Sequence, residues 1–135
     1  MIKALAAGIL LGALIYSPNA PSRGPNPPVD ASLIKGPRLI NAIIRVESSG
    51  DPRAVSKCGA QGLMQVRWKI WGPTLRKEGI AKRKADLFDP ETNVRAGRYI
   101  LAHYLRKHRG DLRKALHAYS GGARGYYRKV MEAQR

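Results

Sequence analysis

The spacing of apolar residues from Pro37 to the end of the chain follows the period of an α-helix. In the first such segment Leu39, Ile43 and Val46 share one helix face. Pro37 suits a first helical position, because the N–H that proline lacks would have no intrahelical partner there. This helix is expected to end at the Ser-Ser-Gly of residues 48–50. No stretch of useful length alternates apolar and polar residues, so the pattern predicts an all-α fold.

Three further helices are predicted from residues that start or stop a helix. Asp89-Pro90 has the order of an N-cap and a first helical residue, and Gly110 is expected to close the helix that follows. Asp111 can cap a short helix over residues 112–119, which ends before a Gly-Gly pair. A last helix is expected at residues 125–133. A chain of 135 residues with these elements is expected to form one compact domain of short helices.

The beginning of the chain has a different composition. Residues 4–16 form an uncharged run that follows a single lysine and precedes small and turn-forming residues, as in a secretory signal. The run is shorter than the roughly 20 residues of a stable spanning helix. We therefore expect residues 1–22 to be a signal peptide, or a weak membrane segment that tethers the protein transiently. Five prolines within residues 17–36 predict a linker over residues 23–36, which leaves residues 37–135 as the folded domain.

Export would place the protein in the periplasm, on the cell-wall side of the membrane, or outside the cell. Its 25 Lys and Arg against nine Asp and Glu leave a formal net charge of +16, which favours anionic partners. Basic runs at residues 75–88 and 106–114 are dense enough for phosphate contacts, so a helical nucleic-acid-binding protein is one hypothesis. The export signal and the spread of the charge over several segments disfavour it. A non-catalytic cationic wall-binding protein is a further alternative.

Glu47 is an isolated carboxylate at the edge of an apolar helix face, with isoleucines three, four and seven positions before it. Partial burial disfavours a charged carboxylate and raises its pKa. Such a group can hold a proton near neutrality, as a general acid for glycosidic-bond cleavage must. The alternative is a helix-end glutamate that pairs with Arg45. In the loop that follows, Gly59 and Gly62 permit close backbone approach, so this loop could lie against a ligand.

Three sequence blocks resemble one enzyme family. The segment ESSGDPRAVSKCGAQGLMQV, residues 47–66, resembles the signature E-S-x-x-x-P-x-A-x-S-x-x-G-A-x-G-L-M-Q of the soluble-type lytic transglycosylases, which share a fold with goose-type lysozyme. NVRAGRYILAHYL is similar to the family's N-x-x-x-G-x-x-Y-L helix, and ALHAYSGG to its A-L-A-A-Y-N-A-G. The blocks keep the family order and span about residues 37–130. The resemblance implies a compact lysozyme-like domain.

The resemblance also implies a set of site residues, with Glu47 as the single catalytic acid and base. The substrate-binding positions that it implies are Ser56 beside the glutamate, Gln65 in the sugar groove, Tyr119 across the cleft, Met64 packed beneath Gln65, and Asn93 holding the loop around the glutamate.

The implied reaction breaks the β-1,4 bond between N-acetylmuramic acid and N-acetylglucosamine in peptidoglycan. Glu47 would protonate the glycosidic oxygen and then accept the proton of the sugar's 6-hydroxyl, which leaves a 1,6-anhydro end without consuming water. The alternative is a hydrolytic lysozyme, in which a second carboxylate activates water. Asp51, Asp86 and Asp89 are the candidates for that second carboxylate, although Asp51 is also suited to a turn with the proline that follows it.

The chain departs from the family pattern at three places near these motifs. Ile100 stands where the family has an aromatic residue, Ser120 replaces an asparagine, and Arg67 replaces a small or apolar residue. These changes are expected to alter the groove or a hydrogen bond near the glutamate. Cys58 is the single cysteine and cannot form an internal disulfide.

No metal or cofactor is expected. The histidines lack the spacing of a recognised metal motif: His103, His108 and His117. The expected partners are peptidoglycan glycan strands, and anionic envelope polymers through the basic surface. A secretion, conjugation or phage lysis apparatus is a further expected partner, and no specific nucleic acid is expected.

Overall fold

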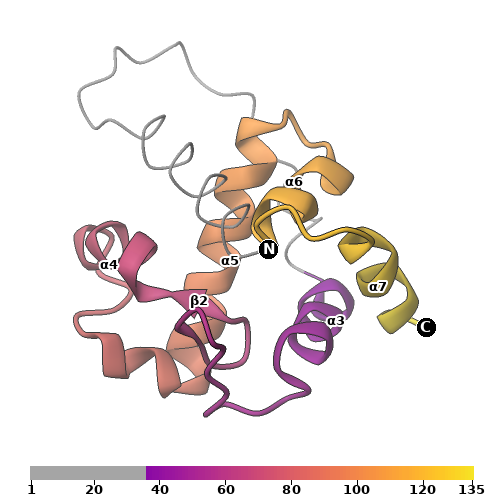
Figure 1. Cartoon of the computed structure of the whole chain (residues 1–135). Helices are drawn as coiled ribbons and strands as arrows, with labels where there is room; N and C mark the ends of the chain where they lie inside the picture. Colours follow the sequence, from indigo (N-terminus) through magenta and orange to yellow (C-terminus); the bar gives the residue numbers. More distant parts are fainter. Residues whose placement is uncertain (1–35) are drawn as a thin grey trace.

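The computed structural model describes residues 36–135 (Figure 1). The predicted leader and, apart from Gly36, the predicted linker lie outside the described residues. The elements are the helices α3 (Pro37–Ser48), α4 (Trp68–Lys77), α5 (Pro90–Lys107), α6 (Leu112–Tyr119) and α7 (Tyr126–Ala133), the 3-10 helix η1 (Lys84–Phe88), and the strands β1 (Ala60–Gln61) and β2 (Val66–Arg67). The predicted helical fold is confirmed.

Local signals determine where several helices begin and end. The N-cap Asp89 accepts a hydrogen bond from the backbone N–H of Thr92, and Asp111 accepts one from that of Lys114. These bonds satisfy N–H groups that have no partner within the helix. Helix α3 ends where Ser49 adopts a left-handed conformation with φ 53°. Helices α3 and α6 therefore have the bounds that the sequence predicts.

The two short strands are not predicted by the sequence pattern. β1 and β2 pair antiparallel, with Ala60 opposite Arg67 and Gln61 opposite Val66, and Val55 forms a single bridge to Gln61. Strands of two residues are too short to show an alternating pattern. They close the base of the loop of residues 61–66, so this small sheet shapes that loop more than it stabilises the fold.

One core holds the helices together. Helix α5 runs through the middle of the molecule and contacts α6, η1 and β2, while α3 packs on α7 (Figure 1). Burial of apolar side chains stabilises this arrangement by about 25 cal/mol for each Å² removed from water. The largest fully buried apolar side chains come from most of the elements: Ile43, Met64, Val66, Leu75, Leu87, Leu101, Leu105, Leu116 and Val130.

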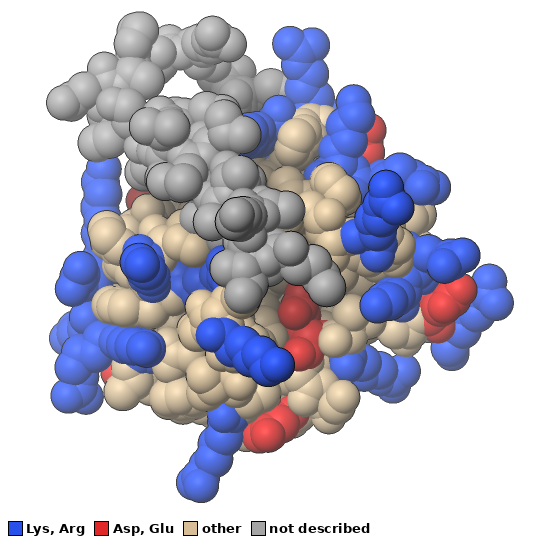
Figure 2. All heavy atoms as spheres, viewed as in Figure 1, with Lys and Arg blue, Asp and Glu red and all other residues tan. Residues whose placement is uncertain are grey.

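The described surface is strongly basic. Figure 2 shows Lys and Arg side chains over much of the visible face, with few Asp and Glu among them. Within residues 36–135, none of the helices combines the length and hydropathy that a membrane span requires.

Candidate functional site

Glu47 lies in the last turn of α3, where α7 packs against that helix. The hydroxyl of Tyr126, the first residue of α7, donates a hydrogen bond to Glu47 Oε1 at 2.6 Å. Burial raises the pKa of the Glu47 carboxyl from 4.5 to about 7, and the bond from Tyr126 opposes this rise because it stabilises the charged form. The site therefore contains a carboxyl group that exchanges its proton near neutral pH.

The Glu47 side chain lines a pocket of about 240 Å³. The walls come from the end of α3, the loop of residues 56–67, α4, α5 and the end of α6. Four of the residues that the sequence singles out as catalytic or substrate-binding are brought together here: Glu47, Ser56, Gln65 and Tyr119.

Ser56 and Gln65 shape the loop that faces the glutamate. Ser56 Oγ accepts a hydrogen bond from the N–H of Ala60 at 3.0 Å, which closes a turn. Gln65 has φ 53°, a left-handed conformation that is uncommon for a residue other than glycine. Its Nε2 donates to the carbonyl oxygens of Ala54 and Gly62 at 3.2 and 3.1 Å. The loop thus holds Gln65 at the pocket wall through its own side chain.

Tyr119 joins α6 to the same loop. Its hydroxyl donates a hydrogen bond to the carbonyl oxygen of Met64 at 2.8 Å. Burial and the nearby Glu47 carboxylate raise the pKa of Tyr119 well above its usual value. The hydroxyl therefore stays protonated and keeps its bond to the loop at any pH at which the protein would work.

Met64 and Asn93 do not line the pocket, and both are fully buried. Asn93 Nδ2 donates to the carbonyl oxygens of Gln61 and Leu87 at 2.8 and 2.7 Å, and its Oδ1 accepts from the N–H of Met64 at 2.8 Å. Neither side chain has surface open to solvent, so the roles that the resemblance implies, packing beneath Gln65 and holding the loop, would act on a substrate only through the loop. They support the loop from below.

Gly62 also has a different role from the expected one. It lies in the buried part of the loop and not on the pocket wall. A Cβ atom at this position would overlap the Asn93 side chain and would lie 2.5 Å from the Leu87 carbonyl oxygen. The glycine therefore permits close approach to Asn93, whereas the sequence predicted close approach to a ligand.

Sequence reasoning missed Tyr126, whose hydroxyl bonds to Glu47, as well as the pocket residues Trp71 and Tyr104. Tyr126 and Val130 are one helical turn apart and both buried in α7. The predicted last helix contained a signal, since a tyrosine on an apolar helix face brings a hydroxyl that needs a hydrogen-bond partner. The identity of that partner could not be read from the sequence, because Glu47 is 79 residues away.

Aromatic and basic side chains complete the pocket. Trp71 of α4 and Tyr104 of α5 meet edge to face, with ring centroids 5.9 Å apart, and both line the pocket. Trp71 is partly exposed and offers a ring surface to a sugar, whereas Tyr104 is 4% exposed and supports the wall from behind. Arg67 is the one Lys or Arg on the described pocket wall. Ile100 adds an apolar wall where the family pattern has an aromatic residue.

Ser120, the other departure, also lines the pocket. Its Oγ donates to the carbonyl oxygen of His117 at 2.8 Å and accepts from the N–H of Ala123 at 3.1 Å. The Ser120 side chain therefore stabilises the turn after α6.

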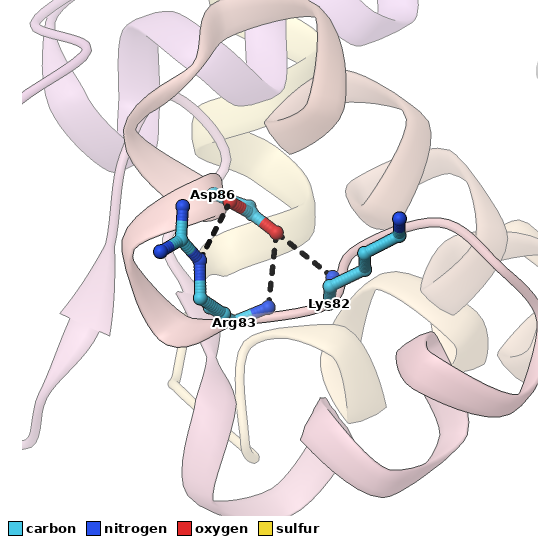
Figure 3. A network of polar contacts seen from close by, with 3 residues as sticks. All are labelled: Lys82, Arg83 and Asp86. Atoms are coloured by element: carbon cyan, nitrogen blue, oxygen red, sulfur yellow. Dashed lines mark hydrogen bonds and ion pairs between the residues drawn. The ribbon is translucent and has the colours of Figure 1, made fainter.

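The three candidates for a second carboxylate lie away from the pocket wall. Asp51 Oδ1 accepts from the N–H of Arg53 at 2.8 Å in the predicted turn, and Asp89 caps α5. Asp86 accepts from the N–H groups of Lys82 and Arg83 (Figure 3). Backbone hydrogen bonds lower the pKa of Asp86 and of Asp89. Both carboxylates are therefore charged, and their oxygens already accept hydrogen bonds from the backbone. In the described part of the chain, Glu47 is the only carboxylate that lines the pocket.

No group of three or more His, Cys, Asp or Glu within residues 36–135 is arranged to hold a metal ion. Cys58 is a free, half-buried cysteine on the pocket wall. The chemistry that the site can support is therefore proton transfer by Glu47 to and from a molecule that lies against the loop and the aromatic rings.

Comparison with known proteins gives a family match. Residues 35–135 match the family described as the transglycosylase SLT domain. A transglycosylase of Enterobacteria phage PRD1 is 37% identical over 86 residues, which are 64% of this chain and 29% of the phage protein. The endo-type membrane-bound lytic murein transglycosylase A of Citrobacter koseri is 44% identical over 64 residues, 45% of this chain and 32% of that protein.

A membrane-bound lytic murein transglycosylase C of Photorhabdus laumondii is 37% identical over 95 residues, 63% of this chain and 27% of that protein. The chain thus spans less than a third of the length of each of these three curated relatives. No solved structure matches it.

Proposed function

The chain belongs to the transglycosylase SLT domain family, and we propose from this premise that it cleaves the glycan strands of peptidoglycan as a lytic transglycosylase. The bond broken is the β-1,4 bond between N-acetylmuramic acid and N-acetylglucosamine. Glu47 is the single acid and base. The proposal agrees with the names of the relatives, two of which are lytic murein transglycosylases.

The observation that carries the proposal is the raised pKa of the Glu47 carboxyl. Its pKa of about 7 means that protonated and charged forms are both populated at neutral pH, so one group can donate a proton and then accept one. It reaches this state inside a pocket that has aromatic walls and contains no other described carboxylate. These features favour a mechanism that needs one carboxylate over one that needs two.

In the first step Glu47 transfers its proton to the glycosidic oxygen as the bond from the anomeric carbon to that oxygen breaks. The N-acetyl group of the muramic acid residue stabilises the sugar cation. The charged Glu47 is held by the hydroxyl of Tyr126 at this stage. It then takes the proton of the sugar's 6-hydroxyl, whose oxygen attacks the anomeric carbon. The product has a 1,6-anhydro end, and Glu47 is protonated again.

The proposal includes the location and the organisation of the chain. Residues 1–22 direct export or tether the protein, residues 23–36 are a linker, and residues 37–135 are the catalytic domain. Two relatives are described as membrane-bound and one comes from a phage, which supports action at the cell envelope. The task there is to open the wall locally, for a secretion or conjugation apparatus or for phage entry or lysis.

The test is digestion of purified peptidoglycan followed by mass spectrometry of the products. We expect products one water lighter than the corresponding hydrolysis products. Glu47→Gln is expected to lower the rate by about 10³-fold, because a carboxamide can neither donate nor accept the proton. Glu132→Gln, which changes an exposed carboxylate of α7, is the matched control and should keep the wild-type rate.

Other outcomes would each change the proposal in a defined way. Reducing ends in place of anhydro ends would mean that water is the acceptor and that the protein is a hydrolytic lysozyme. No products from a folded wild-type protein would reject the proposed enzymatic activity. The cationic wall-binding and nucleic-acid-binding hypotheses would then replace it.

A further inference from the structure

A second cavity, larger than the first, lies between the end of α5, helix α6, the turn after α6 and the start of α7. Its volume is about 770 Å³. No Asp or Glu is among the described residues that line it. The Lys, Arg and His side chains of its lining are Lys107, His108, Arg113, Lys114, His117 and Arg128.

The cations of this second cavity are not neutralised by carboxylates. Within residues 36–135 the one ion pair is Arg83–Asp86, and it belongs to the segment before α5. Lys107, Lys114 and Arg128 are exposed. Charges of one sign in a concave surface raise the local concentration of the opposite ion. An anionic group is therefore the ligand that the second cavity favours.

Two further observations support this charge character. The guanidinium of Arg113 lies over the ring of Tyr127, 4.3 Å from the centroid, which holds the cation in place at the cavity wall. The pKa of His108 is lowered, first by burial and then by the charges of Lys107 and Lys114. Asp111 acts in the opposite direction on His108 and does not outweigh these effects.

The second cavity adjoins the catalytic pocket. Tyr104 and Gly121 line both. Tyr126, whose hydroxyl bonds to Glu47, is also part of the second cavity's lining. These three residues are buried and form a wall between the two cavities. The second cavity thus lies about one tyrosine side chain away from Glu47, a separation that a single substrate molecule can span.

We propose that the second cavity binds the carboxylates of the peptide stem carried by the muramic acid residue at the bond that Glu47 cleaves. This inference rests on the proposed function and names the form of the substrate: stem-bearing glycan in preference to bare glycan. The stem is a short peptide with more than one free carboxylate, and a cavity of about 770 Å³ can hold several of its residues. A strand without stems keeps one lactyl carboxylate beside each muramic acid ring and leaves the second cavity empty.

The test compares two substrates and two charge-matched variants. The substrates are soluble stem-bearing strands and the same strands after an amidase has removed the stems. The Lys107→Gln/Lys114→Gln variant removes two cations from the second cavity. The Lys82→Gln/Lys84→Gln control removes two exposed cations in and just before η1, which precedes the first residue of α5. Figure 3 shows Lys82 next to Arg83 and Asp86.

We expect the ratio of kcat/KM on stem-bearing strands to that on stripped strands to fall at least about tenfold in the variant, since a single bond to a charged group is worth about that factor. The control should keep the wild-type ratio. An unchanged ratio in the variant, or an equal fall in the control, would overturn the proposal, since the cations would then act only through overall charge.

A binding measurement separates this proposal from the proposed function. The Glu47→Gln protein, with and without the two lysine substitutions of the second cavity, is titrated with isolated stem tetrapeptide and followed by NMR. Weaker binding in the substituted protein would support the cavity assignment even if the wild type cleaved neither substrate. Equal binding would reject it even in an active enzyme. Loss of binding to phosphatidylglycerol vesicles, with the tetrapeptide unaffected, would reassign the second cavity to lipid headgroups.

Discussion

The pKa of Glu47 depends on two opposing influences from its surroundings. Burial makes the charged carboxylate unfavourable, while the hydroxyl of Tyr126 makes it less so. Without the burial the group would be charged and unable to donate at neutral pH. Without the hydroxyl it would hold its proton more firmly and would act as a base only at higher pH. In the proposed mechanism, this pair of residues sets the pH range over which one carboxyl can both donate and accept a proton.

At this scale we predict the effect of Tyr126→Phe. Loss of the hydrogen bond removes the influence that lowers the pKa of Glu47, so the pKa moves above about 7. The protonated acid then persists to higher pH, and the alkaline limb of the kcat/KM profile should shift upward by about one pH unit. The measurement is a pH–rate profile on peptidoglycan strands.

The matched control is Tyr127→Phe. Tyr127 is the next residue along α7, and its ring can still lie under Arg113 after the hydroxyl is lost. An alkaline limb that stays in place in Tyr126→Phe, or that moves equally in both variants, would contradict the role given to Tyr126.

Helix α5 positions the pocket through the loop that it supports. Asn93 and Gly97 lie one turn apart on α5, so they present the same face to the loop. Asn93 bonds to the backbone of Gln61 and Met64, and Gly97 leaves room for the Met64 side chain. The Met64 carbonyl in turn accepts the bond from Tyr119. Packing on α5 thus determines where the pocket wall lies.

The element-scale prediction is that Gly97→Ala destabilises the fold by about 1–3 kcal/mol, because an added Cβ would lie 2.6 Å from Met64 Cε and force the loop away. Helix propensity alone would make the alanine variant more stable by about 1 kcal/mol. The sign of the measured change in stability therefore distinguishes an effect of packing from an effect of helix propensity. Urea denaturation of the wild type and the variant measures it. Arg95→Ala, at an exposed position of the same helix, is the control and should change stability little. A gain of stability in Gly97→Ala would reject the packing argument.

At the scale of the whole molecule, the site reduces the stability of the fold. The pKa of Glu47 is about 7 in the folded protein against 4.5 in an exposed carboxyl, so the folded state binds a proton more tightly than the unfolded state does. The free energy of unfolding must then decrease as the pH rises from about 4.5 to about 7, and the loss is complete above this range. The full shift corresponds to about 3 kcal/mol at most.

We therefore predict that Glu47→Gln is more stable than the wild type above pH 7, by up to about 3 kcal/mol, and that this difference disappears below pH 4.5. Glutamine can still accept the hydrogen bond of Tyr126 and has no charge to desolvate. Thermal or urea unfolding of both proteins across this pH range measures the difference. A gap that did not vary with pH would show that Glu47 is not the group responsible.

The basic surface and the second cavity are also properties of the whole molecule. The net charge of +16 follows from the composition alone, and it is enough to indicate an anionic partner. Composition cannot show where the charges gather. Lys107 lies at the end of α5 and Arg128 lies in α7, and they line one cavity only because the α5, α6 and α7 helices pack together.

The sequence by itself determined the features that depend on neighbouring residues. The bounds of α3 and α6, and the caps Asp89 and Asp111, follow from contacts within a single turn of chain, which propensity and spacing describe well. The motif around Glu47 indicated the family for the same reason, since its residues are contiguous.

Only the tertiary structure decided the contacts between distant segments. Tyr126 meets Glu47, Asn93 holds the loop of Gln61 to Met64, and Gly62 makes room for Asn93 instead of a ligand. Each of these contacts joins residues that are tens of positions apart, and each depends on how the helices pack. Burial, which turns an ordinary glutamate into a carboxyl with a pKa of about 7, exists only when those segments have come together.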